Sequence, residues 1–96
     1  MTFSEWLKHQ LIIYNIKQAD IARACNVTNG NVSNWMAKNN FPSNASIVAI
    51  ANLLTELYLP QCYAKQTREG LVFNMICMIE IERDARQTAK QDQHAD

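Results

Sequence analysis

The chain has 96 residues, of which 48% are hydrophobic and only two each are glycine and proline. This length allows one compact core, and the scarcity of glycine and proline favours long helices over a turn-rich β fold. Nine basic residues balance nine acidic ones, which excludes the strongly basic proteins that coat nucleic acid without regard to sequence.

The first two predicted helices occupy the N-terminal quarter of this all-α chain. Ser4 is a candidate N-cap for the first helix, which is expected to end near Tyr14. The second helix is expected from Lys17 to Cys25. Asn26 should close it, because Asn tolerates the left-handed backbone conformation that turns a chain sharply.

Two further helices are predicted after that turn. Thr28 is a good N-cap for a third helix from Asn29 to about Ala37. Ser43 or Asn44 can cap a fourth helix. Helical spacing predicts that the buried stripe of this fourth helix consists of Ile47, Ile50, Ala51 and Leu54.

From about Ser4 to Leu54 the sequence resembles the Cro and phage-repressor family of helix-turn-helix proteins, the lambda-repressor-like domains. Pro42 and the stripe after it resemble the proline-led fourth helix of that family. The family pattern also has a small residue where the two motif helices cross, which keeps them close. The motif residues that carry the resemblance are Gln18, Ala22, Val27, Val32 and Trp35.

The resemblance implies a bundle of four to five helices that binds double-stranded DNA and regulates transcription, most simply as a repressor. In this family the second motif helix lies in the major groove and the first crosses the phosphate backbone. The implied base contacts are Asn29, Gly30, Asn31, Ser33 and Asn34, and the implied phosphate contacts are Gln18, Lys17, Thr28 and Lys38.

Two residues depart from the family pattern. Asn26 stands at the turn position that is usually Gly, which Asn can replace without strain. Gly30 stands where the family often has a base-reading side chain, although Gly early in a helix costs about 1 kcal/mol relative to Ala. Gly30 therefore either permits close approach of the backbone to DNA or leaves this position without a reader.

The C-terminal part predicts two more helices. Pro60 can begin a fifth helix, which runs through Ala64 until Gly70 interrupts it. A sixth helix from Leu71 is apolar on nearly every face, so it should be buried on both sides, against the fourth helix and against a second subunit. The predicted homodimer interface is Leu71, Val72, Phe73, Met75, Ile76, Met78 and Ile79.

This organisation divides the chain into a DNA-binding domain at 1–59, a helical dimerisation extension at 60–90 and a disordered tail at 91–96. Two alternatives stay open for the apolar segment. Residues 72–81 could form a β-strand, because Val, Ile and Phe favour strands. The segment could also be an ordinary core helix of a monomer.

Other functions find little support in the sequence. No nucleophile lies near a histidine, no phosphate-binding loop is present, and the three cysteines lack metal-ligand spacing. We therefore expect no enzyme, cofactor, metal, small-molecule ligand or membrane segment, and a cytoplasmic protein of a bacterial or phage-infected cell. The alternative function is an antitoxin-type module that binds a toxin through its C-terminal helix and also represses its own operon.

Overall fold

A computed structural model describes the backbone of residues 1–57 and 67–94, and the side chains as far as Gln87. Within these ranges the chain forms five α-helices and no strand. The prediction of an all-α chain is confirmed, and the strand alternative for 72–81 is excluded. The helices are α1 (Phe3–Ile13), α2 (Gln18–Cys25), α3 (Asn29–Met36), α4 (Asn44–Glu56) and α5 (Arg68–His94).

Local capping bonds explain where three of the boundaries fall. The Thr28 hydroxyl accepts a hydrogen bond from the Asn31 amide at 3.2 Å, which caps the start of α3. The Ser43 hydroxyl does the same for α4 through the Ser46 amide, also at 3.2 Å. Asn26 closes α2 in the left-handed conformation, with φ 56° and ψ 44°. These three predictions are confirmed.

The predicted N-cap at Ser4 is wrong. Thr2 caps α1 by accepting a hydrogen bond from the Glu5 amide at 3.2 Å. Ser4 lies inside the first turn and is buried, and its hydroxyl donates to the Met36 carbonyl at 2.6 Å. This bond ties the start of α1 to the end of α3 and satisfies a carbonyl that the helix end leaves without an intrahelical partner.

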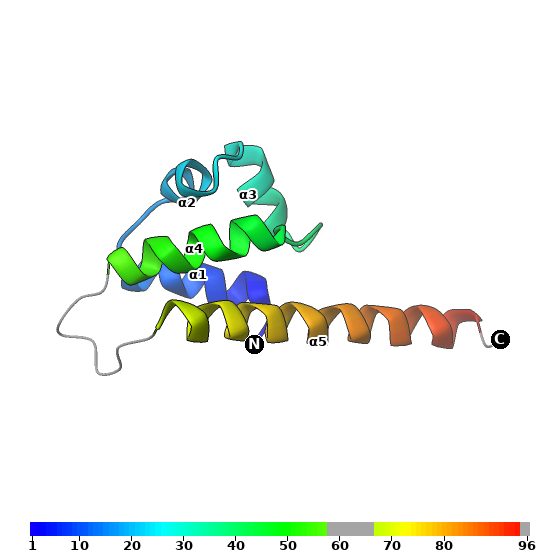
Figure 1. Ribbon diagram of the computed structural model, residues 1–96. Coiled ribbons are helices and arrows are strands. Elements are labelled where there is room, and N and C mark those ends of the chain that lie inside the picture. Colours follow the sequence, from blue (N-terminus) through cyan, green and yellow to red (C-terminus); the bar gives the residue numbers. More distant parts are fainter. Residues whose placement is uncertain (58–66, 95–96) are drawn as a thin grey trace.

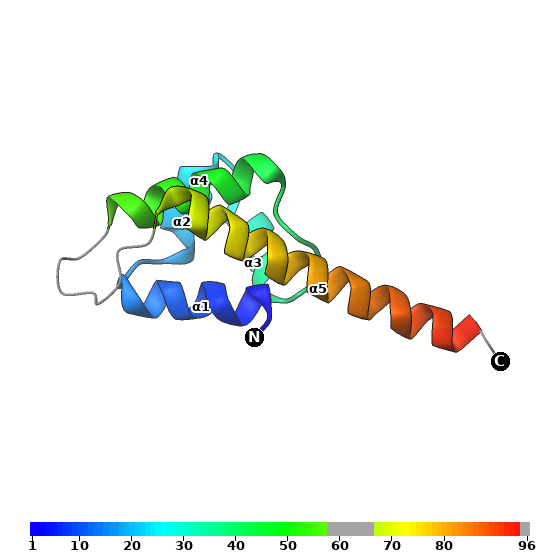
Figure 2. The same ribbon diagram turned by 60° about the horizontal axis from the view of Figure 1, so that its bottom comes forward.

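The helices lie in three levels (Figure 1). The pair α2 and α3 lies on one side, α5 lies on the opposite side, and α1 and α4 run between them. The turned view shows α5 crossing the body and its C-terminal half extending past it (Figure 2). The core between these levels contains buried side chains from all five helices, among them Leu7, Ile21, Val32, Ile50 and Met75.

The start of α5 differs from the prediction. Gly70 does not interrupt a helix but lies in the first turn of α5, and its amide donates to the Thr67 hydroxyl at 3.0 Å. The predicted helix from Pro60 to Ala64 lies outside the described residues. At the other end α5 continues to His94, so the predicted disordered tail at 91–96 is helical as far as the structure describes it.

Polar contacts fix the middle of α5 on the body. The guanidinium groups of Arg83 and Arg86 lie 5.2 and 4.8 Å from the ring centroid of Phe41, in cation–π geometry. Arg86 also donates to the Lys38 carbonyl at 3.0 Å. The Phe3 amide donates to the Glu82 carboxylate. These contacts hold α5 beside the start of α1 and the loop that follows α3.

Candidate nucleic-acid interface

The inner face of α2 and α3 anchors the pair on the body. Ala22, Val32 and Trp35 are buried, and Val27 packs against the same core. The Val27 amide donates to the Ala22 carbonyl at 3.0 Å, which closes the turn around Asn26. The turn and the small Ala22 therefore fix how α3 leaves α2, and the opposite face of α3 is left to solvent.

That outer face of α3 contains every predicted base-contact residue. All of them are exposed, and none is charged. The Ser33 hydroxyl donates to the Gln18 side-chain oxygen at 3.3 Å. The side-chain oxygen of Asn34 accepts from the side-chain amide of Asn39 at 3.4 Å. The side chains with no such bond among the described residues are those of Asn29 and Asn31. The face is therefore an uncharged amide and hydroxyl surface.

The predicted phosphate contacts separate into two places. Gln18 begins α2 and touches α3 through Ser33, and Lys17 precedes it as an exposed residue. The Thr28 hydroxyl accepts from the Asn31 amide, which leaves its own proton available to a phosphate oxygen. These three residues surround the N-terminal ends of the two helices.

Lys38 lies at the other end of α3, away from that group. Its ammonium is 3.5 Å from the Glu5 carboxylate, and both side chains are about half exposed. Such a solvent-exposed ion pair contributes little to stability, so a phosphate could replace the carboxylate at little cost. Lys38 also adopts the left-handed conformation, with φ 64°, which turns the chain away from α3.

Gly30 is not required by the fold. Its φ is not positive, and an added Cβ would meet only the Thr28 hydroxyl oxygen, at the ordinary contact distance of 3.7 Å. Gly30→Ala should therefore raise the free energy of unfolding by about 0.5–1 kcal/mol, because Ala loses less backbone entropy in a helix. Thermal denaturation measures this, and a less stable variant would show that the fold does need Gly30. A DNA titration of the same variant decides between the two roles of Gly30, a close approach of its backbone to DNA or a position that makes no base contact.

The predicted dimer interface needs correction. Leu71, Met75 and Ile79 are buried in the chain's own core, so they are wrong as interface residues. They form the inner stripe of α5, spaced four residues apart. Met78 is half-buried against the same core. Val72 and Ile76 are likewise half-buried against this core. Phe73 is the predicted interface residue that lies exposed.

Two exposed apolar residues of α4 and α5 were not among the predicted interface residues. Val48 on α4 is 40% exposed and lines a hollow with Val72, Phe73 and Ile76. Ile81 on α5 is 68% exposed. The signal for Val48 was present in the sequence, because it stands outside the stripe that begins at Ile47. An apolar residue off the buried stripe of a helix is a candidate for a second contact.

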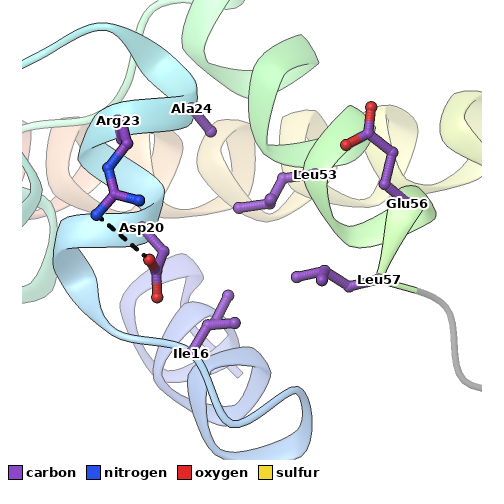
Figure 3. Close-up of a pocket in the computed structure, with 7 residues that line it drawn as sticks. All are labelled: Ile16, Asp20, Arg23, Ala24, Leu53, Glu56 and Leu57. Carbon is purple, nitrogen blue, oxygen red and sulfur yellow. Dashed lines mark ion pairs between the residues drawn. The ribbon is translucent and has the colours of Figure 1, made fainter.

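Another hollow lies between α2 and the C-terminal end of α4 (Figure 3). It has a volume of about 450 Å³ and is lined by Ile16, Asp20, Arg23, Ala24, Leu53, Glu56 and Leu57. Its floor is apolar, and the charged groups of Asp20 and Arg23 pair with each other at 3.6 Å on its rim. No arrangement of catalytic groups faces it among the described residues.

The cysteines of the described part behave as small apolar side chains. The Cys25 thiol donates to the Ser46 carbonyl at 3.6 Å, and burial raises its pKa. Cys77 is half-buried on α5, and Cys62 lies outside the described residues. In the part of the chain that is described, no three His, Cys, Asp or Glu side chains form a metal-binding group, and no helix has the length and apolarity to cross a bilayer.

No protein-family model, curated protein or solved structure matches this chain.

Proposed function

We propose that this chain is a sequence-specific DNA-binding transcriptional regulator of the repressor type. In this proposal α3 enters the major groove, α2 crosses the phosphate backbone, and two copies bind a palindromic operator. The observation that carries the proposal is the composition of α3. Its inner face is held by buried Val32, Trp35 and Met36, while its outer face presents uncharged residues capable of hydrogen bonding.

The chemistry of that face favours recognition of specific bases over binding to DNA of any sequence. Asn can donate to and accept from the N7 and N6 positions of adenine at the same time, which distinguishes adenine from the other bases. Asn is also a mediocre helix former, so three of them in an eight-residue helix are costly unless they serve another purpose. A solvated helix surface would be more stable with Lys, Glu or Gln.

The charge distribution supports a dimer. A reading face without a cation binds phosphate weakly by itself, and the whole chain has no net charge. Two copies on one duplex raise the effective affinity without any new contact residue. The two-fold relation also predicts half-sites whose centres are about one helical turn, or 34 Å, apart.

An antitoxin-type module is the second candidate, and one observation favours it. Phe73 and Ile81 on α5 are 67% and 68% exposed, which leaves apolar surface for a different protein. A homodimer that covers Phe73 would remove much of that support. Co-purification of a second small protein in a fixed ratio would favour the antitoxin-type module.

Asn29→Ala should relax the base preference at one operator position by about 1–3 kcal/mol, because it removes one bidentate contact. Gln18→Ala should instead weaken binding to all sequences alike, because a phosphate contact carries no sequence information. Binding is measured on the best-bound duplex from a random pool and on its single-base variants.

The matched control for these variants is Asn74→Ala, which truncates an exposed Asn on α5, on the opposite side of the body. It should leave both affinity and base preference unchanged. An unchanged preference in Asn29→Ala and in Asn34→Ala, with intact folding, would contradict the reading role of α3.

A further inference from the structure

A second stripe of α5 follows the spacing of a helix–helix seam. Glu69, Phe73, Ile76, Glu80 and Arg83 recur at intervals of four and three residues, which places them along one face of the helix. This stripe differs from the inner stripe of Leu71, Met75 and Ile79, which is buried. It is the face of α5 on which an additional helix could lie.

The stripe borders a groove between α4 and α5. One hollow of about 370 Å³ is lined by Val48, Arg68, Glu69, Val72, Phe73 and Ile76. A second hollow continues past Ile76 to Glu80 and Arg83, beside Pro42, Asn44 and Ile47 of the loop and α4. Ile76 lines both hollows, so they lie next to each other along the two helices, and we call them together the α4–α5 groove.

The centre of this groove is apolar and accessible. Phe73 is 67% exposed and Val48 is 40% exposed, and Val72 and Ile76 are half-buried beside them. Large apolar side chains that gather in one patch, with charges at its ends, are typical of a protein contact surface.

The charges at the two ends of the stripe indicate which molecule binds in the groove. Glu69 lies seven residues before Ile76 and Arg83 lies seven residues after it. A two-fold axis at Ile76 therefore brings Glu69 of one copy level with Arg83 of the partner subunit when the helices run antiparallel. In a parallel pair, Glu69, Glu80 and Arg83 would each lie beside the same residue of the partner subunit. Like charges would then face each other, which costs free energy.

We infer that a second copy of this chain docks on the α4–α5 groove, with its α5 antiparallel and Ile76 at the two-fold axis. The two ends of the stripe, Glu69 and Arg83, are then complementary in charge and its centre is apolar, as an isologous contact requires, while Glu80 lies level with Val72 of the partner subunit. Because α5 and the α2–α3 pair lie on opposite sides of α1 and α4 (Figure 1), this contact leaves the outer face of α3 uncovered. The inference rests on the homodimer of the proposed function and specifies its register.

A charge exchange tests this register. Glu69→Arg should raise the dimer dissociation constant roughly tenfold, because two attractive surface pairs become repulsive. Arg83→Glu should have a similar effect on the dimer, and it also removes the contact of this guanidinium with the Phe41 ring. The double variant Glu69→Arg/Arg83→Glu should return to within roughly threefold of the original constant, since it restores both pairs with reversed polarity. Sedimentation equilibrium over a concentration series measures the constant.

The control is Lys8→Glu, an exposed charge reversal on α1, which should not change the dissociation constant. Far-ultraviolet circular dichroism checks that each variant is folded. The milder pair Glu69→Gln and Arg83→Gln removes the charges without reversing them, and should weaken dimerisation by a smaller factor. The effects should shrink at high salt, because exposed charges are screened.

The outcomes separate this inference from the proposed function. A double variant as weak as its parents would overturn the antiparallel register, whatever the chain binds. A monomer at all concentrations would overturn both the register and the homodimer, while sequence-selective DNA binding could still be measured. A dimer that follows the charge exchange but selects no DNA sequence would support the register and contradict DNA reading.

Discussion

Met75→Ala is expected to lower the free energy of unfolding by about 2–5 kcal/mol, which is a large part of the stability of a domain this small. Met75 is completely buried in the core shared by α5 and the rest of the chain. Its truncation leaves a cavity that the surrounding helices cannot fully close. Urea denaturation monitored by tryptophan fluorescence measures the loss, which should not depend on protein concentration.

Phe73→Ala is the matched control for Met75→Ala on the opposite side of α5. Phe73 is mostly exposed, so the stability of the monomer should change by no more than about 0.5 kcal/mol. Its effect should appear in the dimer dissociation constant instead. If Met75→Ala weakened only dimerisation and left the monomer stable, α5 would belong to an interface and not to the core.

Trp35→Ala is expected to have the largest effect of all, a loss of about 3–5 kcal/mol. Trp35 is buried at 5% exposure and anchors α3 on the body. Without it α3 would no longer be held in place, so DNA binding should fall in proportion to the folded fraction. Thermal unfolding and a DNA titration of the same sample measure the two quantities.

Ser33→Ala is the control for Trp35→Ala, two residues earlier on the exposed face of the same helix. It should change stability by about 0.5 kcal/mol or less, since it removes only the exposed 3.3 Å bond to Gln18. A stable Trp35→Ala variant that had lost DNA binding would mean that Trp35 faces the DNA, contrary to the core described above.

The boundaries of α2, α3 and α4 were predictable because their signals are local. Thr28, Ser43 and Asn26 each act on a backbone group a few residues away, and such contacts leave a recognisable pattern in sequence. Ser4 was misassigned for the opposite reason. Its hydroxyl bonds to a carbonyl 32 residues later, and no local spacing encodes that distance.

The division of α5 into an inner and an outer stripe could not be decided from sequence. Nearly every position from Leu71 to Ile79 is apolar, so hydrophobic periodicity does not choose which residues face the body. The choice depends on tertiary contacts of the more polar part, where Glu82 and Arg86 fix the rotation of the helix against Phe3 and Lys38.

The exposed face of α3 was predicted in full, since Val32 and Trp35 mark the buried side of the helix and the residues on its other side must point outward. The bonds that restrain this face were not. The contacts Ser33–Gln18 and Asn34–Asn39 join residues whose relative positions depend on how the chain turns at Asn26 and Lys38. They leave Asn29 and Asn31 as the least restrained amides.

Selection of bound sequences from a pool of random duplex DNA, with the intact chain, tests the central proposal most directly. We predict enrichment of one motif made of two inverted half-sites, containing adenines at the positions that α3 reads, with half-site centres about one helical turn apart. A pool that shows no enriched sequence after repeated rounds would contradict sequence-specific DNA binding by this protein.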